Sequence, residues 1–324
     1  MNLSNLALVR YLPVETDFAF IRMRVGAFIL SLVLIIGSVV AFFALGLNLG
    51  IDFRGGTAIE ISTEGPADIG AIREVLSSRV PGDLQVQGFG SESEVLIRVG
   101  QVTAAEINAI EGLSAEDDAA AQQVVRRLVE AALREAFPGV SFERMEVISP
   151  QVSEELQVAG TTAVLVSLLL MLIYIWLRFE WQFSVGAVLS LAHDVIVTIG
   201  FFAVTQMQFN LPTIAAILTI VGYSMNDTVV VYDRIREMFR KYKSLPTAQV
   251  LDLAINATLS RTIMTSGTTL IALVAMAFMG GPALESFAWA LIWGVAIGTY
   301  SSIFVAAPLL TVTGVRRDSG DREE

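Results

Sequence analysis

Long apolar runs alternate with a single large polar segment along this chain. The apolar runs cover residues 25–47, 158–177, 184–205, 211–232, about 261–280 and about 287–310. A helix of about 20 apolar residues is long enough to cross the hydrocarbon core of a bilayer. The pattern therefore predicts a polytopic α-helical membrane protein with six transmembrane helices.

The first apolar run follows a short N-terminal segment, residues 1–24, that carries Arg10, Arg22 and Arg24. A secretory signal peptide has a shorter apolar core and a cleavage site flanked by small residues. Neither feature is evident here, so residues 25–47 are interpreted as a span that the mature protein retains.

The polar segment, residues 48–155, has the pattern of a small independent domain. Alternating and β-branched residues predict strands, and apolar stripes at helical spacing predict helices between them. The predicted strands are 57–62, 84–89, 94–99 and 141–148, and the predicted helices are 66–80 and 115–137. The order β-α-β-β-α-β is the ferredoxin-like pattern, in which two helices cover one face of a four-stranded sheet. This α+β domain is expected between the first and second spans.

The second to sixth spans lie within residues 156–312, interrupted by a charged loop at 233–260 and followed by a tail at 313–324. Residues 246–259 are amphipathic and are predicted to lie along the membrane surface. Lys and Arg gather on the side of the N-terminal segment, the charged loop and the tail, whereas the short loops 206–210 and 280–286 contain none. The distribution predicts that both termini are cytoplasmic and that the domain is external.

Composition and charge agree with a membrane protein. The 324 residues are 54% hydrophobic and 16% charged, whereas a soluble domain carries about 25% charged residues. The net charge of −11 is local, because residues 48–155 contain 8 Lys and Arg against 19 Asp and Glu. The chain has no cysteine and one histidine, which excludes disulfides, thiolate chemistry and histidine metal clusters.

A few ionisable residues fall inside the apolar runs or at their edges. Asp227 lies within the fourth run, where a carboxylate costs about 2.5–3.5 kcal/mol on insertion scales and marks a functional site. It shares a helical face with Thr219 and Tyr223, so that face is expected to need a partner. The sequence predicts a polar core formed by consecutive spans and suited to proton coupling; its members are His193, Asp194, Asn226, Asp227 and Arg261.

Simpler interpretations remain open for these residues. Asp194 is also explained as a packing residue that holds His193 or a serine. Arg261 is also explained as an interfacial side chain that extends toward water. Asp233 is interpreted as part of a solvated face, and Glu285 as the first turn of an external helix. With no nucleotide motif, nucleophile triad or metal site in the sequence, we predict that the chain is not an enzyme, holds no cofactor and does not bind nucleic acid.

Several motifs together resemble the SecF family of bacterial Sec protein-export subunits. They occur in the family's order across nearly the whole chain and include Gly50-Ile-Asp52-Phe-Arg-Gly55-Gly56-Thr57, Ala192-His193-Asp194, Gly222-Tyr-Ser-Met-Asn226-Asp227-Thr228 leading to Asp233-Arg234, Arg261–Thr269, and Gly280-Gly281-Pro282. Arg54 departs from the pattern, because many relatives carry Thr or another small polar residue there.

The resemblance implies an architecture and a function. The family belongs to the resistance-nodulation-division superfamily, in which a SecD half and a SecF half pack pseudo-symmetrically in the bacterial inner membrane. Further expected partners are the SecYEG channel, a small accessory membrane subunit and the unfolded translocating protein. The complex is expected to use the proton-motive force to assist late translocation and periplasmic release. Asp227 would then be the proton-responsive carboxylate and Arg261 its charge partner, with protons as the coupling ion.

Two other functions compete with this one. A proton-driven exporter of small molecules or lipids has a related architecture, but it needs a substrate cavity in the external part, for which about 100 residues are few. A passive scaffold would use the intramembrane charges for assembly alone. Neutralising Asp227 separates these hypotheses, because it would abolish assembly of a scaffold and leave assembly of a coupled export subunit intact.

Overall fold

The computed structural model describes residues 16–110 and 112–315, and within them it confirms the prediction of six helices long and apolar enough to span a membrane. Arg10 and the tail from residue 316 onward lie outside the described residues. The helices are α1 (Arg24–Leu45), α6 (Pro150–Arg178), α7 (Trp181–Thr205), α8 (Leu211–Lys241), α9 (Thr247–Met279) and α10 (Pro282–Ser301). A short 3₁₀ helix, η2 (Phe20–Met23), precedes α1, and the π-helical turn η3 (Ser302–Ala306) continues α10 into α11 (Ala307–Thr313).

The structure corrects the predicted loop at 233–260. α8 continues through the charged residues to Lys241, and α9 already begins at Thr247, so the connection is only residues 242–246. The apolar side chains of the first half of α9 are grouped as predicted, but they are buried against the helix bundle: Val250, Leu251, Ala254, Ile255 and Leu259. The segment expected along the membrane surface therefore forms the first part of the continuous helix α9.

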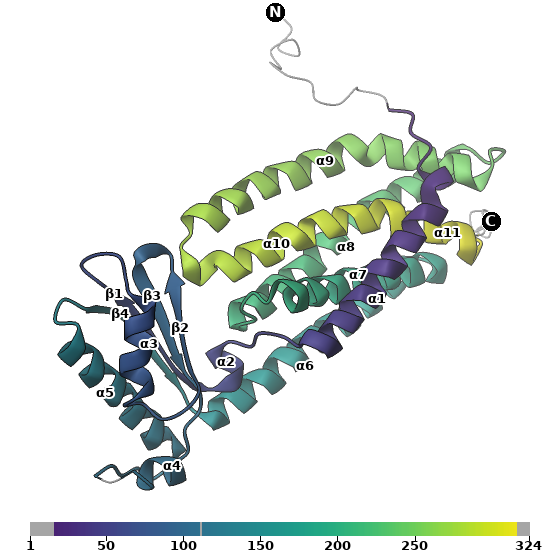
Figure 1. The fold of residues 1–324 in the computed structure, drawn as a ribbon. Coiled ribbons are helices and arrows are strands. Elements are labelled where there is room, and N and C mark those ends of the chain that lie inside the picture. The colour runs from purple at the N-terminus through teal and green to yellow at the C-terminus, as the bar shows by residue number, and fades with distance from the viewer. Residues whose placement is uncertain (1–15, 111, 316–324) are drawn as a thin grey trace, which may run out of the picture.

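The α+β domain lies at one end of the helix bundle, between α1 and α6 (Figure 1). Its strands β1 (Gly56–Ser62), β2 (Leu84–Phe89), β3 (Ser91–Val99) and β4 (Ser141–Ile148) form an antiparallel sheet in the order β2-β3-β1-β4. The helices α3 (Ile69–Ser77) and α5 (Asp118–Ala136) contact each other and the sheet. Ile59 and Ile97 are paired across β1 and β3, are fully buried, and face these helices in the domain core.

Helix starts in the domain are set by capping side chains that the periodicity did not locate. The carboxylates of Asp68 and Asp117 accept hydrogen bonds from the amides of Ala71 (3.0 Å) and Ala120 (2.7 Å), three residues into α3 and α5. An N-cap of this kind satisfies an otherwise unpaired amide. Both helices therefore begin three residues later than predicted, and a short helix that was not predicted, α4 (Ala104–Asn108), precedes α5.

Helix α10 lies in the middle of the bundle, with α9 on one side and α7 and α8 on the other (Figure 1). Its glycines allow close packing on α8: a Cβ at Gly294 would lie 2.2 Å from Ile220 Cδ1, and one at Gly298 would lie 3.0 Å from Ser224 Cβ. Small residues let helix backbones approach in this way. The Gly294–Gly298 pair thus has the packing role that its spacing indicates.

The segment that joins α1 to the domain is bound to the turn between α7 and α8. Gly50 N–H donates to Phe209 O and Phe209 N–H donates to Asn48 O, both at 2.8 Å. Within the short helix α2 (Ile51–Arg54), Asp52 accepts a hydrogen bond from the Leu211 amide (2.8 Å) and so caps the start of α8. The domain is thereby attached to the helices by backbone contacts beyond the chain connection itself.

Two glycines at the start of β1 have a backbone conformation that other residues rarely adopt. Gly55 has φ +70° and Gly56 has φ +116°, and a Cβ at Gly56 would lie 2.3 Å from Val99 O. The contact is with backbone of the neighbouring strand, so it cannot be relieved by a side-chain rotation. This pair turns the chain from α2 into the sheet.

We expect Gly56→Ala to destabilise the α+β domain by about 2 kcal/mol or more, from backbone strain and the contact with Val99. Amides of β1 and β3 in the detergent-solubilised protein should then exchange hydrogen about 30-fold faster, because local opening needs less free energy. Gly65→Ala is the matched control, since Gly65 has no heavy atom within 4 Å of the added Cβ. Equal exchange rates in both variants would contradict the assignment.

Candidate functional site

Asp194 is a fully buried carboxylate near the middle of α7. Its Oδ2 accepts hydrogen bonds from Ser224 Oγ of α8 (2.5 Å) and Ser301 Oγ of α10 (2.8 Å), and its Oδ1 lies 2.9 Å from His193 Nδ1. A buried carboxylate is tolerated when its oxygens are hydrogen-bonded. Asp194 therefore joins three helices through one side chain.

Asp227 is the second buried carboxylate, with 9% of its surface exposed. Thr262 Oγ1 of α9 donates to its Oδ1 at 2.7 Å, and Ser302 Oγ, at the start of η3, donates to its Oδ2. Ser224, which binds Asp194, lies three residues before Asp227 on α8. One ligand of each carboxylate thus comes from a pair of adjacent serines, Ser301 and Ser302.

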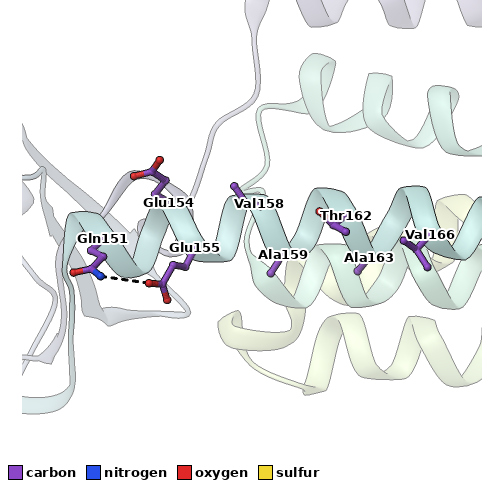
Figure 2. A pocket seen from close by; sticks show the side chains of 8 residues that line it. All are labelled: Gln151, Glu154, Glu155, Val158, Ala159, Thr162, Ala163 and Val166. Carbon is purple, nitrogen blue, oxygen red and sulfur yellow. Dashed lines mark hydrogen bonds between the residues drawn. The ribbon is translucent and has the colours of Figure 1, made fainter.

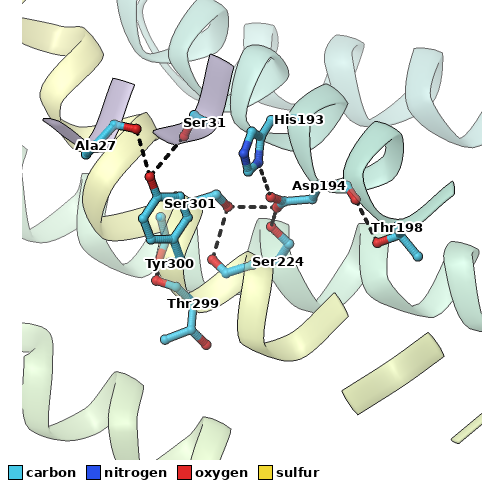
Figure 3. A network of polar contacts seen from close by, with 11 residues as sticks. Ala27, Ser31, His193, Asp194, Thr198, Ser224, Thr299, Tyr300 and Ser301 are labelled. Atoms are coloured by element: carbon cyan, nitrogen blue, oxygen red, sulfur yellow. Dashed lines mark hydrogen bonds and ion pairs between the residues drawn. The ribbon is translucent and has the colours of Figure 1, made fainter. Parts of the chain in front are cut away.

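Four consecutive residues at the end of α10 and the start of η3 each contact a different helix, and Figure 3 shows the contacts of Tyr300 and Ser301. Thr299 Oγ1 lies 2.7 Å from Ser266 Oγ of α9. Tyr300 OH donates a hydrogen bond to Ala27 O of α1 (2.8 Å) and lies 3.0 Å from Ser31 Oγ of the same helix. Ser301 and Ser302 follow with their bonds to Asp194 and Asp227. Successive residues of a helix point about 100° apart, so a central helix can reach neighbours in every direction. We call residues 299–302 the hydroxyl hub.

The helix changes its hydrogen-bonding pattern within the hydroxyl hub. α10 ends at Ser301, and the π-helical turn η3 begins at Ser302. Single π-helical turns inside α-helices are rare and frequent at functional sites. Here the change falls between the serine that binds Asp194 and the serine that binds Asp227, so it sets their relative orientation.

His193 is buried beside the hub, with its ring centroid 6.1 Å from that of Tyr300. Its Nδ1 faces Asp194, and its Nε2 is buried with no hydrogen-bond partner in the structure. An imidazole with one free nitrogen in a polar core can accept or release a proton without losing another contact. The structure thus brings His193, Asp194 and Asp227 into one polar core, as the sequence predicts.

Arg261 and Asn226 have different surroundings. Both side chains are exposed, and Arg261 forms no ion pair with another residue in the described part of the chain. Its neighbour Thr262 contacts Asp227 instead. The pairing of Asp227 with Arg261 stays a prediction, and the hydroxyl partners Thr262, Ser301 and Ser302 were not identified from the sequence. The sequence signal for two of them is the run Thr-Tyr-Ser-Ser, residues 299–302, in an apolar span.

The other motif residues have structural surroundings. Asp233 and Arg234 form exposed ion pairs, with Arg178 (3.6 Å) and Glu237 (2.6 Å) respectively. Gly281 has φ +72° and precedes α10, which begins at Pro282, whereas a Cβ at Gly280 would lie 2.4 Å from Met276 O. Gly222 has no heavy atom within 4 Å of an added Cβ.

Part of the surface of the membrane-spanning helices carries exposed or unpartnered polar groups. On α8, Thr219 and Asn226 are exposed, and Tyr223 has a buried hydroxyl with no partner. On α6, an open groove of about 710 Å³ runs from Gln151, Glu154 and Glu155 to the small residues Ala159 and Ala163 (Figure 2). Polar groups of spanning helices usually face other protein. These surfaces are therefore suited to contact with another membrane chain.

The carboxylates and hydroxyls together can hold protons and connect helices. A serine or threonine hydroxyl both donates and accepts, so it can reverse its hydrogen bond when the neighbouring carboxylate gains a proton. Within the described residues, no group of three or more His, Cys, Asp and Glu side chains is arranged to hold a metal ion. The hydroxyl groups link the two carboxylates to α8, α9, α10 and η3.

Known protein families and proteins match this chain along most of its length. Residues 128–316 match the family model "Protein export membrane protein SecD/SecF, C-terminal", and residues 40–67 match the "SecD/SecF GG Motif" model. "Protein translocase subunit SecF" of Vibrio alginolyticus is 41% identical over 95% of this chain and 93% of that protein. The protein of the same name from Rhodobacter capsulatus is 40% identical over 97% of this chain and 94% of that protein.

Solved structures agree with the sequence comparison. The crystal structure of SecDF, a translocon-associated membrane protein from Thermus thermophilus, matches with a TM-score of 0.80 and 34% identity over 94% of this chain. SecDF in a "Super-membrane-facing form" matches with a TM-score of 0.67 at the same identity and coverage. This chain spans 39% of the length of each of these SecDF chains.

We expect Asp194→Leu to destabilise the helix bundle by about 2 kcal/mol or more, because the buried hydroxyl of Ser224 would lose its partner. Asp194→Asn keeps an acceptor oxygen for the serines, and its amide can donate to His193 Nδ1, so its cost should be below about 1 kcal/mol. Thermal unfolding of the detergent-solubilised protein compares the two. An Asn variant as unstable as the Leu variant would show that the negative charge itself holds the helices together.

Proposed function

Because this chain belongs to the SecF family of protein translocase subunits, we propose that it uses the proton-motive force, with a SecD-like partner, to assist late translocation and release of exported proteins. The observation that carries the proposal is the pair of buried carboxylates, Asp194 and Asp227, held by adjacent serines of one central helix. A scaffold needs no such titratable pair in the middle of the membrane helices.

The energy for coupling comes from protons that enter the buried core. One elementary charge that crosses the membrane potential provides about 2.3 kcal/mol per 100 mV. A change of about 1.4 kcal/mol already shifts a two-state equilibrium tenfold. Protonation of a single carboxylate is therefore sufficient to bias a rearrangement of helices, and no covalent chemistry or nucleotide is required.

Asp227 is the proposed proton-responsive group and Arg261 its alternate partner. In this structure Thr262 donates to Asp227, and Arg261 precedes Thr262 on the same helix. Adjacent helical residues are about 100° apart, so a rotation of α9 about its axis would exchange the threonine hydroxyl for the guanidinium. Ionised Asp227 favours the guanidinium, whereas protonated Asp227 favours the hydroxyl contact seen here.

The rearrangement would reach the α+β domain through the segment around α2. This segment is bound to the α7–α8 turn by Gly50, Phe209 and the Asp52 cap of α8, and α8 carries Asp227. The two SecDF structures match this chain with TM-scores of 0.80 and 0.67 at the same identity. That difference supports an architecture with more than one arrangement of its parts.

The partner we propose is a SecD-like membrane subunit. The exposed polar residues Thr219 and Asn226, the unpartnered Tyr223 hydroxyl and the groove on α6 provide a surface for it. The matched SecDF chains are longer than this one and contain a further part beyond the region of similarity. The SecYEG channel, a small accessory membrane subunit and the unfolded translocating protein are proposed as further partners from the family relationship.

The location of the protein in the cell is part of the same proposal. The inner membrane is the expected location, with both termini cytoplasmic and residues 48–155 periplasmic. The domain that would face the exported protein is proposed to be ferredoxin-like, supported by the strand order β2-β3-β1-β4 and by two helices that pack together on the sheet.

The first test is the release of an exported protein from spheroplasts whose only copy of the gene encodes Asp227→Asn. We expect release to fall to the level of the deletion strain, because the amide cannot take up the proton, while the SecD-like partner stays at normal abundance. The matched control is Asp233→Asn, an exposed carboxylate six residues along the same helix. Loss of the partner in Asp227→Asn would favour the scaffold, and unchanged release would place the proton site elsewhere.

The predicted orientation is tested with single cysteines, since the chain has none of its own. Ser91→Cys, at the exposed start of β3, should react with a membrane-impermeant maleimide on intact spheroplasts. Ser244→Cys, in the exposed connection between α8 and α9, should react only after the membrane is permeabilised. The reverse labelling pattern would invert the proposed topology.

A further inference from the structure

A small cavity lies where the α+β domain meets the membrane helices, and no part of the proposed function uses it. The cavity has a volume of about 50 Å³, which is room for a small polar group. Its wall includes two arginines, Arg54 and Arg98, together with Asp83, Gln85, Leu49 and Ile51. The site is thus formed by the end of α2, the start of β2 and the end of β3.

Arg98 is held in a fixed position at this cavity. It lies on β3 between Ile97 and Val99, which face the domain core, so its side chain leaves the sheet on the opposite face. One guanidinium nitrogen, Nη2, donates to Gln208 Oε1 in the α7–α8 turn (2.6 Å), and Nε is buried without a hydrogen-bond partner. A donor that is buried and unpaired is costly, so the site has an unmet need for an acceptor.

The two arginines lack a counter-charge within the described residues. Neither Arg54 nor Arg98 forms an ion pair there, and the exposed Asp83 carboxylate, although it lines the same cavity, is not within ion-pair distance of either guanidinium. Burial, and then the positive charge of Arg54, lower the pKa of Arg98. An anion between the two guanidinium groups would offset both effects.

The cavity lies at the level where the spanning helices end. α7 ends at Thr205 and α8 begins at Leu211, and Gln208, the partner of Arg98, lies between them. The polar headgroup region of a bilayer lies immediately outside its hydrocarbon core. Phosphate groups of lipids on the domain's side of the membrane are therefore found at this depth, next to the apolar Leu49 and Ile51.

We propose that Arg54 and Arg98 bind a phosphate group, and that its source is the headgroup of an anionic phospholipid in the leaflet on the domain's side. The planar guanidinium fork matches phosphate oxygens and forms charge-assisted hydrogen bonds with them. The bound headgroup would join α2, β3 and the α7–α8 turn at one point.

The test uses full-length protein in detergent, examined by native mass spectrometry with added dioleoyl phosphatidylglycerol. We expect Arg54→Gln to bind this lipid about tenfold more weakly than the wild type, which is the loss of one charge-assisted contact. Arg54 is exposed, so its substitution should leave the fold intact. Arg127→Gln, an exposed arginine on α5, is the matched control and should bind like the wild type.

Three further ligands identify what the site recognises. Dioleoylglycerol has the same acyl chains without phosphate and should not be retained, and inorganic phosphate should compete only weakly with the lipid. Competition by inorganic phosphate at the lipid's own concentration would support the phosphate site and overturn the lipid source. Retention of phosphatidylglycerol by Arg54→Gln at the wild-type level, or Arg54-dependent binding of an acidic peptide in place of the lipid, would overturn the proposal.

Discussion

The need to satisfy buried carboxylates among membrane-spanning helices governs the arrangement of this protein. Asp194 and Asp227 are buried in α7 and α8, and their oxygens are satisfied by hydroxyl groups from α8, α9, α10 and η3. Each of these bonds fixes the rotation of one helix against another. The same contacts that make the carboxylates tolerable therefore determine how the bundle packs.

The hydroxyl hub concentrates these contacts in residues 299–302 of one central helix. The hub touches α1, α7, α8 and α9, so the hydrogen bonds of both carboxylates contribute to the packing of several helices. The π-helical turn at Ser302 places the break in helix geometry between the two carboxylates.

The α+β domain depends on the helices at a second point, the segment from Asn48 to Gly56. Its backbone is bound to the α7–α8 turn, Asp52 caps α8, and the positive φ of Gly55 and Gly56 directs the chain into the sheet. The cavity with Arg54 and Arg98 lies at the same junction. The domain and the carboxylate-bearing helix α8 thus meet within one short stretch of chain.

The sequence by itself determined the number of spans and the strands of the domain, because both follow from local hydrophobic periodicity. It also determined the buried position of His193, Asp194 and Asp227, because each is an ionisable residue within an apolar run. The tertiary structure alone decided the partners. Thr262, Ser301 and Ser302 come from helices distant along the chain and have side chains that are ordinary in spans, so no local pattern distinguishes them. The tertiary structure also decided where residues 246–259 pack. Their apolar face suits a membrane surface and a helix bundle equally well, and in the fold it is buried against the bundle. Periodicity shows that a face is buried, and only the fold shows against what.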